Sequence, residues 1–212
     1  MACRRNARRR EWELGNLEDA IDQLDSSREI ETMNNQTTSQ QTYARVAGFT
    51  FLFYIAAGIS SLSLGSEAQG VELLYFLQSL SAFVLGVTLY EITRGQGPVL
   101  ALLALTCRIA EGIGSGESEI FFALGSLFFC WLLLRGRLIP AWMAWLGVIA
   151  SALLTVILPL QLVGVLAGTG WASSITWILW LPMLVFEVAV AFWMLVKGVS
   201  TGQGPTMMQS TP

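Results

Sequence analysis

Six apolar segments separated by short polar loops fill most of the chain after residue 43. A helix of about 20 apolar residues crosses the ~30 Å hydrocarbon core of a bilayer. Hydrophobic residues make up 54% of the chain and charged residues only 13%, whereas an ordinary soluble domain has about 25% charged residues. We therefore expect an all-α integral membrane protein, built as a bundle of six transmembrane helices. The segments are 44–64, 71–93, 98–113, 119–134, 140–162 and 174–196, of which the third and fourth are short for a span.

Loop charges predict how these helices run through the membrane. With six crossings, the basic residues near the segment ends all fall on one side; they are Arg45, Arg94, Arg135, Arg137 and Lys197. The acids near the other ends, Glu67, Glu72, Glu117 and Glu119, fall on the opposite side. Because basic loops stay in the cytoplasm, we expect both termini to be cytoplasmic, in a multi-pass protein of the plasma (cell) membrane. The loops are short and glycine-rich, so neighbouring helices should pack antiparallel.

Residues 1–42 are polar and should form a cytoplasmic N-terminal extension and linker ahead of the transmembrane domain, residues 43–198. The arginine run at residues 4–10 is followed by no apolar stretch, so a signal peptide is not expected. Leu17, Ile21 and Leu24 recur at helical spacing, which predicts either an amphipathic arm that touches lipid or a partner, or a frayed surface helix. Met33 is a second candidate start, which makes residues 1–32 a candidate non-native extension. Residues 32–42 should be a flexible linker, and residues 199–212 a flexible C-terminal tail.

Three charged residues lie within the apolar segments and away from the ends that carry the loop charges: Arg108 and Glu111 in the third and Glu187 in the sixth. A charge at the centre of a membrane helix costs about 2.5–3.5 kcal/mol on insertion scales, so each needs a partner or water. Counted from the basic side, Arg108 and Glu187 both lie ten residues into their helices, at ~15 Å depth. Tyr54 reaches a similar depth, and Glu111 stands one turn further out, level with Gln78. These five residues form the candidate substrate or ion site.

Two interpretations of this polar layer remain open. In the first, Arg108, Glu111 and Glu187 form a binding site of a small carrier or ion-coupled protein, because intramembrane ionisable groups usually mark pathways. In the second, Arg108 and Glu187 form a structural ion pair in a non-catalytic partner subunit, sensor or scaffold. Either way, Arg108 and Glu187 should face each other across the bundle interior, at hydrogen-bonding or one-water distance. Two acids against one base favour the first interpretation, because one carboxylate must hold a proton, bind a cation or be hydrated.

The residue inventory argues against most catalytic chemistry. Histidine, the usual ligand of haem and catalytic zinc and the usual partner of a serine or cysteine nucleophile, is absent from the chain. The cysteines, Cys3, Cys107 and Cys130, form no C-x-x-C pair. We expect no cofactor, no metal and no nucleic-acid partner, and we rank an enzyme behind both interpretations above. The expected partners are the lipid bilayer and a small molecule or cation that the sequence does not identify; the oligomeric state also stays open.

Several short motifs, taken in order, resemble those of a known family. They are residues 43–48 (YARVAG), 102–111 (LLALTCRIAE), 138–147 (LIPAWMAWLG), and 186–187 (FE) with 193–198 (WMLVKG). Together they resemble family 4386 of the domains of unknown function, which are bacterial multi-pass membrane proteins, over residues 42–199. The chain is shorter between Glu111 and Phe121 than this family leads us to expect. The resemblance implies a membrane protein and carries no mechanism, because the family has no established activity.

Overall fold

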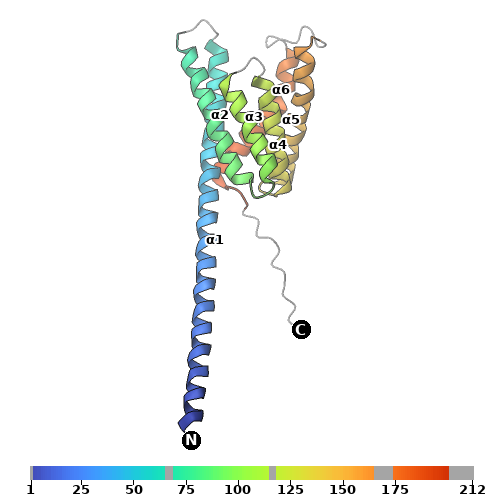
Figure 1. The fold of residues 1–212 in the computed structure, drawn as a ribbon. Helices are drawn as coiled ribbons and strands as arrows, with labels where there is room; N and C mark the ends of the chain where they lie inside the picture. Colours follow the sequence, from blue (N-terminus) through green and yellow to red (C-terminus); the bar gives the residue numbers. More distant parts are fainter. Residues whose placement is uncertain (1, 65–68, 115–117, 165–173, 201–212) are drawn as a thin grey trace. The chain divides into compact units, whose positions relative to one another are not determined.

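The computed structural model of the 212-residue chain describes residues 2–64, 69–114, 118–164 and 174–200 (Figure 1). Within these ranges the chain forms six α-helices and no β-strand, so the prediction of an all-α fold with six helices is confirmed for the described residues. The helices are α1 (Ala2–Leu64), α2 (Val71–Thr93), α3 (Pro98–Ile113), α4 (Ser118–Arg135), α5 (Ala141–Leu162) and α6 (Ser174–Val196).

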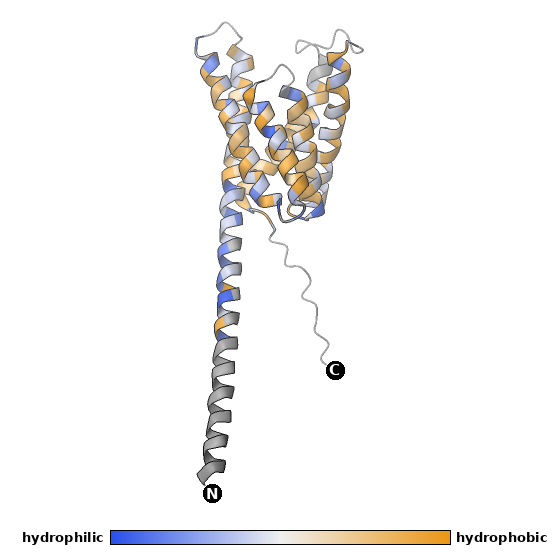
Figure 2. Ribbon diagram, in the orientation of Figure 1, coloured by the Kyte–Doolittle hydropathy of each residue, from blue (hydrophilic) through white to orange (hydrophobic). Residues whose placement is uncertain are grey.

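Five of the described helices, α1, α2, α4, α5 and α6, are long and apolar enough to cross a membrane. The remaining helix, α3, has 16 residues, fewer than the about 20 that a span usually needs. Apolar residues dominate α2 to α6 along most of their length (Figure 2). These properties are those of a membrane protein.

Both faces of α5 are apolar, but they differ in side-chain size. The buried residues are Met143, Ala144, Gly147, Ala150, Ser151, Leu154 and Leu158. The large apolar residues that stay exposed are Trp142, Trp145, Ile149, Leu153 and Val156. Small residues on the inside allow close helix packing, and large ones on the outside suit contact with lipid. A helix that is apolar all round is typical of a membrane span or a deeply buried helix.

Gly147 brings α5 close to its two neighbours. A Cβ atom at this position would lie 2.6 Å from the Phe186 ring of α6 and 2.7 Å from Cys130 Sγ of α4. One turn further along, the Ser151 hydroxyl is buried and donates to Met183 Sδ at 3.7 Å. Small residues four apart on α5 therefore let α4 and α6 pack closely against it.

Residue Gln41, in α1 just ahead of its apolar part, lies beside the end of α6. Gln41 Nε2 donates to the Val199 carbonyl oxygen at 2.8 Å, and the Ser200 backbone nitrogen donates to the Leu138 carbonyl oxygen, between α4 and α5, at 3.0 Å. The α2–α3 turn lies at this end of the bundle as well (Figure 1). We call it the basic end, because the residues at these termini and turns include Arg45, Arg94, Arg135, Arg137 and Lys197.

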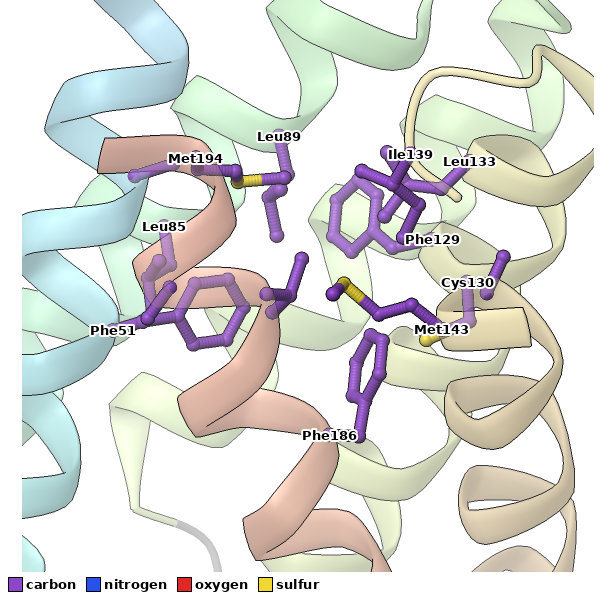
Figure 3. Packing of buried hydrophobic residues seen from close by; sticks show 14 of the residues in the cluster. Phe51, Leu85, Leu89, Phe129, Cys130, Leu133, Ile139, Met143, Phe186 and Met194 are labelled. Carbon is purple, nitrogen blue, oxygen red and sulfur yellow. The ribbon is translucent and has the colours of Figure 1, made fainter. Parts of the chain in front are cut away.

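A continuous apolar core fills the half of the bundle next to the basic end and extends along α5 to Leu158; Figure 3 shows part of it from close by. Phe51 of α1, Leu89 of α2, Phe129 of α4 and Met194 of α6 all belong to it and are buried. Met143 of α5 packs among them. Ala104 of α3 belongs to the core as well, so side chains from all six helices form it.

Residue contacts divide the chain into two units, Met1–Ser39 and Gln40–Pro212, close to the predicted boundary after residue 42. Helix α1 continues without a break through residues 32–42, so the expectation of a flexible linker there is wrong. Residues 16–47 contain no glycine or proline to interrupt the helix. The Thr37 and Thr38 hydroxyls each donate to the Asn34 carbonyl oxygen at 2.9 Å, so polar side chains bond within the helix. Nearly all of the predicted tail at residues 199–212 lies outside the described residues.

Candidate functional site

Helix α3 carries a buried ion pair. Arg108 Nη1 donates to Glu111 Oε2 at 2.8 Å, and the two side chains are 1% and 6% exposed. The residues are three apart, so they lie on the same face of the helix. The other carboxylate oxygen, Glu111 Oε1, accepts a 2.6 Å hydrogen bond from the Tyr54 hydroxyl of α1. Both oxygens of Glu111 are therefore satisfied by groups of the bundle.

The guanidinium of Arg108 has further contacts on α4. Its Nη2 donates to Ser126 Oγ at 3.0 Å, and its Cζ lies 4.8 Å from the centroid of the Phe122 ring. Gly86 of α2 makes room for the aliphatic stem, because a Cβ there would lie 3.0 Å from Arg108 Cβ. Within the described residues, only Arg108 Nε of this guanidinium lacks an acceptor. Together these contacts offset part of the cost of burying the charge.

The predicted direct pairing of Arg108 with Glu187 is wrong. Among the described residues, the ion-pair partner of Arg108 is Glu111. Equal depth places Arg108 and Glu187 at one height in the bundle, but it does not ensure a direct ion pair between them. Glu111, one turn away on the same helix, reaches the guanidinium without crossing to another helix.

Glu187 is buried without a bonding partner for one of its oxygens. The residue is 5% exposed, and its Oε1 has no hydrogen-bond donor within the described part of the chain. An unpaired buried carboxylate is costly, because it loses its hydration and gains nothing in return. The two glutamates of the predicted site thus differ sharply: Glu111 is fully bonded and Glu187 is not.

A cavity of about 590 Å³ lies between α1, α2, α3, α4 and α6. Four of the five predicted site residues line it: Tyr54, Gln78, Glu111 and Glu187. The fifth, Arg108, lies behind its wall and borders a separate space of about 10 Å³. The structure therefore brings the predicted residues together, with Arg108 in a supporting position.

The cavity occupies the half of the bundle away from the basic end. Its lining residues come from the last turns of α1 and α3, the first half of α2, the first turns of α4 and the first two-thirds of α6. The apolar core described above fills most of the other half. The hollow and the filled halves meet near Phe122, which belongs to both the cavity wall and the core.

Aromatic rings form much of the cavity wall. The Tyr54 and Phe122 rings are nearly parallel, with centroids 6.4 Å apart, and the Phe122 and Trp180 centroids are 5.5 Å apart. Tyr75 and Trp177 also line the cavity. Carboxylates beside aromatic faces can bind a positively charged group through ionic and cation–π contacts. Within the described residues, no group of three or more histidine, cysteine, aspartate or glutamate side chains could hold a metal ion.

Part of the chain matches a known family. Residues 114–198 match the model of a family described as Domain of unknown function (DUF4386). The chain resembles DUF4386 proteins over α4, α5 and α6, and the predicted resemblance is confirmed for these residues. The match includes Ser126 and Glu187 and begins after Arg108 and Glu111. Comparisons with curated proteins and with solved structures gave no match.

Sequence reasoning missed Ser126, Phe122 and Trp180, all in the part of the chain that matches DUF4386. Ser126 had a usable signal: it is a polar residue inside the apolar fourth segment, and a buried hydroxyl needs a partner. Phe122 and Trp180 gave no such signal in the sequence, because phenylalanine and tryptophan are common in apolar helices whether they face lipid, core or cavity.

Proposed function

We propose that this chain is a six-span membrane protein that binds a small molecule or a coupled ion in the cavity of its helix bundle. It would belong to the small carriers or ion-coupled proteins of a bacterial plasma membrane, with both termini in the cytoplasm. Five span-length helices and the loop bases gathered at one end support this topology. The cavity would then lie in the outer half of the membrane.

The unpaired carboxylate of Glu187 is the observation that carries the proposal. A glutamate kept only for structure would be bonded as Glu111 is, with both oxygens satisfied. Glu187 instead presents a buried, unbonded oxygen on a helix that lines a cavity. Cavities of roughly 300–1,000 Å³ are the size that binds small molecules, and this one has about 590 Å³. A bound ligand or ion would supply the missing partner.

A second function, as a non-catalytic partner subunit, sensor or scaffold, draws support from a different observation. The Arg108 side chain links three helices through Glu111, Tyr54 and Ser126, and each of these hydrogen bonds joins two groups of the protein. Such a network fixes how α1, α3 and α4 pack. On this alternative the charges serve only to hold the helices together.

A cavity-filling substitution separates the two functions. The full chain would be purified in detergent micelles, and its thermal unfolding measured against a panel of small neutral, cationic and anionic compounds. In Leu184→Trp the larger side chain fills the cavity, because Leu184 lines it. The matched control is Val185→Trp, at the neighbouring residue, which is 50% exposed.

We expect some compounds to raise the melting temperature of the wild type and of Val185→Trp but not that of Leu184→Trp. Equal shifts in all three proteins would place binding outside the cavity and overturn the proposal. A panel with no stabilising compound would favour the partner, sensor or scaffold function.

A further inference from the structure

The charged residues of the cavity wall all carry the same sign. Glu111, Glu119 and Glu187 line it, and no lysine or arginine does so among the described residues. Arg108, behind the wall, pairs with Glu111. Even with Glu119 left aside, Glu187 remains as an acidic side chain that no basic residue of the described ranges contacts as an ion pair. An anionic ligand would therefore meet repulsion in this cavity, and a cation would meet attraction.

The wall is poorly suited to a bare metal ion. Magnesium and calcium bind about six to eight oxygen ligands at short range, whereas the wall offers separated carboxylates and aromatic rings. The volume of about 590 Å³ is also many times that of a single ion. Aromatic faces do attract organic ammonium groups, and they pack well against apolar ligand bodies.

Helix α6 gives the cavity a polar end and an aromatic end. Trp180, Leu184 and Glu187 line it at spacings of four and three residues, so they form one stripe along the helix. Seven residues separate Trp180 from Glu187, a rise of ~10 Å along the axis. Glu187 is the deeper of the two, since α6 begins at Ser174 on the far side from the basic end. A ligand lying along this stripe would place a charged group deep and an apolar body further out.

We infer that the cavity binds an organic ammonium cation, about 10 Å long, whose charged group pairs with Glu187 and whose apolar body packs against Leu184 and Trp180. This inference rests on the proposed function and adds the chemical class of the ligand. The cation supplies the partner that Glu187 Oε1 lacks within the described residues. Phe122, next to Trp180 in the wall, extends the aromatic surface.

Three aromatic probes of similar size test the inference. Benzyltrimethylammonium carries a permanent positive charge, neopentylbenzene is its neutral isostere, and phenylacetate is an anion. Binding of each to the full chain in lipid nanodiscs would be measured by calorimetry and by the shift in melting temperature. The variants are Glu187→Gln, Trp180→Leu, and the control Glu91→Gln, whose residue pairs with Arg94 and does not line the cavity.

We expect the cation to bind more tightly than the isostere, and the anion not to bind. Glu187→Gln should weaken cation binding at least tenfold and leave the isostere nearly unaffected, and Trp180→Leu should weaken both severalfold. Glu91→Gln should bind like the wild type. Trp180→Leu also keeps the test valid if Glu187→Gln fails to fold.

Tighter binding of the isostere or the anion would overturn the inference while leaving a ligand cavity in place. Cation binding that survives Glu187→Gln but is lost in Leu184→Trp would remove Glu187 as the counter-ion and overturn it as well. If none of the three probes binds, the ammonium class is wrong, and the broader compound panel described above decides separately whether the cavity binds ligands at all.

Discussion

Glu111→Ala removes the counter-ion of Arg108, an arginine that is 1% exposed, and leaves the Tyr54 hydroxyl without its acceptor. We expect the free energy of unfolding to fall by about 3–5 kcal/mol, the usual cost of leaving one partner of a buried ion pair uncompensated. Glu187→Gln should behave differently. It breaks no ion pair and replaces a buried carboxyl group by a neutral amide of nearly the same shape, so stability should stay unchanged or rise.

The chain contains its own control for this comparison. Glu91 pairs with Arg94 at 3.0 Å and with the same three-residue spacing, but the side chains are 25% and 58% exposed. Glu91→Ala should therefore cost less than about 1 kcal/mol, as for other surface pairs. Replacing Arg108 and Glu111 together by methionine should recover much of the loss seen in Glu111→Ala, because no unpaired charge then remains.

Titration of the purified protein with sodium dodecyl sulfate in mixed micelles, followed by circular dichroism, would measure these changes. Equal losses for Glu187→Gln and Glu111→Ala would refute the reasoning, since they would make Glu187 a counter-ion of Arg108. A loss for Glu91→Ala as large as for Glu111→Ala would show that burial does not set the magnitude.

Three other predictions concern contacts outside this pair and the topology. Ser126→Ala should lower the free energy of unfolding by about 1.5–3 kcal/mol, because Arg108 Nη2 loses an acceptor at 3.0 Å; an unchanged titration would mean that another group replaces the hydroxyl. Gly147→Ala should lower the free energy of unfolding by roughly 1–3 kcal/mol through overpacking. Gly95→Ala is the control and should lower it little, because no atom lies within 4 Å of the added Cβ. Similar melting temperatures for the two variants would contradict this prediction. Cysteines in the outer loops should label from outside intact cells with a membrane-impermeant reagent, and those in the inner loops should not; labelling at Gly136 would contradict six crossings. The outer sites are Ser66, Ser115 and Thr169, and the inner ones Gln96 and Gly136.

The bounds of the helices and the residues of the candidate site could be predicted from the sequence. Glycine-rich loops between apolar runs predicted five of the six helices to within about a residue at each end. Helical rise placed Tyr54, Arg108 and Glu187 at one depth; Tyr54 and Glu187 line the cavity of about 590 Å³, and Arg108 lies behind its wall. Rise along a helix is almost independent of packing, which explains why depth was predictable.

Which acid pairs with Arg108 could not be predicted in the same way. The direction in which Glu187 points depends on how α6 is rotated against its neighbours, and that rotation is set by contacts such as Gly147 with Phe186. Depth carries no information on rotation. The cavity could not be predicted either, because a cavity forms where the side chains of several helices leave space unfilled. The supposed linker was misjudged for a simpler reason: its polar composition suggested disorder, although it contains no residue that breaks a helix.

The short third helix has a consequence for the bilayer around it. With 16 residues, α3 is ~24 Å long. In the proposed topology it crosses a hydrocarbon layer that is ~30 Å thick, so it is about 6 Å too short. At its C-terminus Gly114 adopts a left-handed conformation, and its nitrogen donates to the Glu111 carbonyl oxygen at 3.1 Å. Carbonyl groups of the last turn of a helix lack partners within the helix itself, and capping groups or water satisfy them. Gly112 and Gly114 line the cavity, and water drawn to this helix end would thin the outer leaflet and form a wet funnel leading down to Glu187.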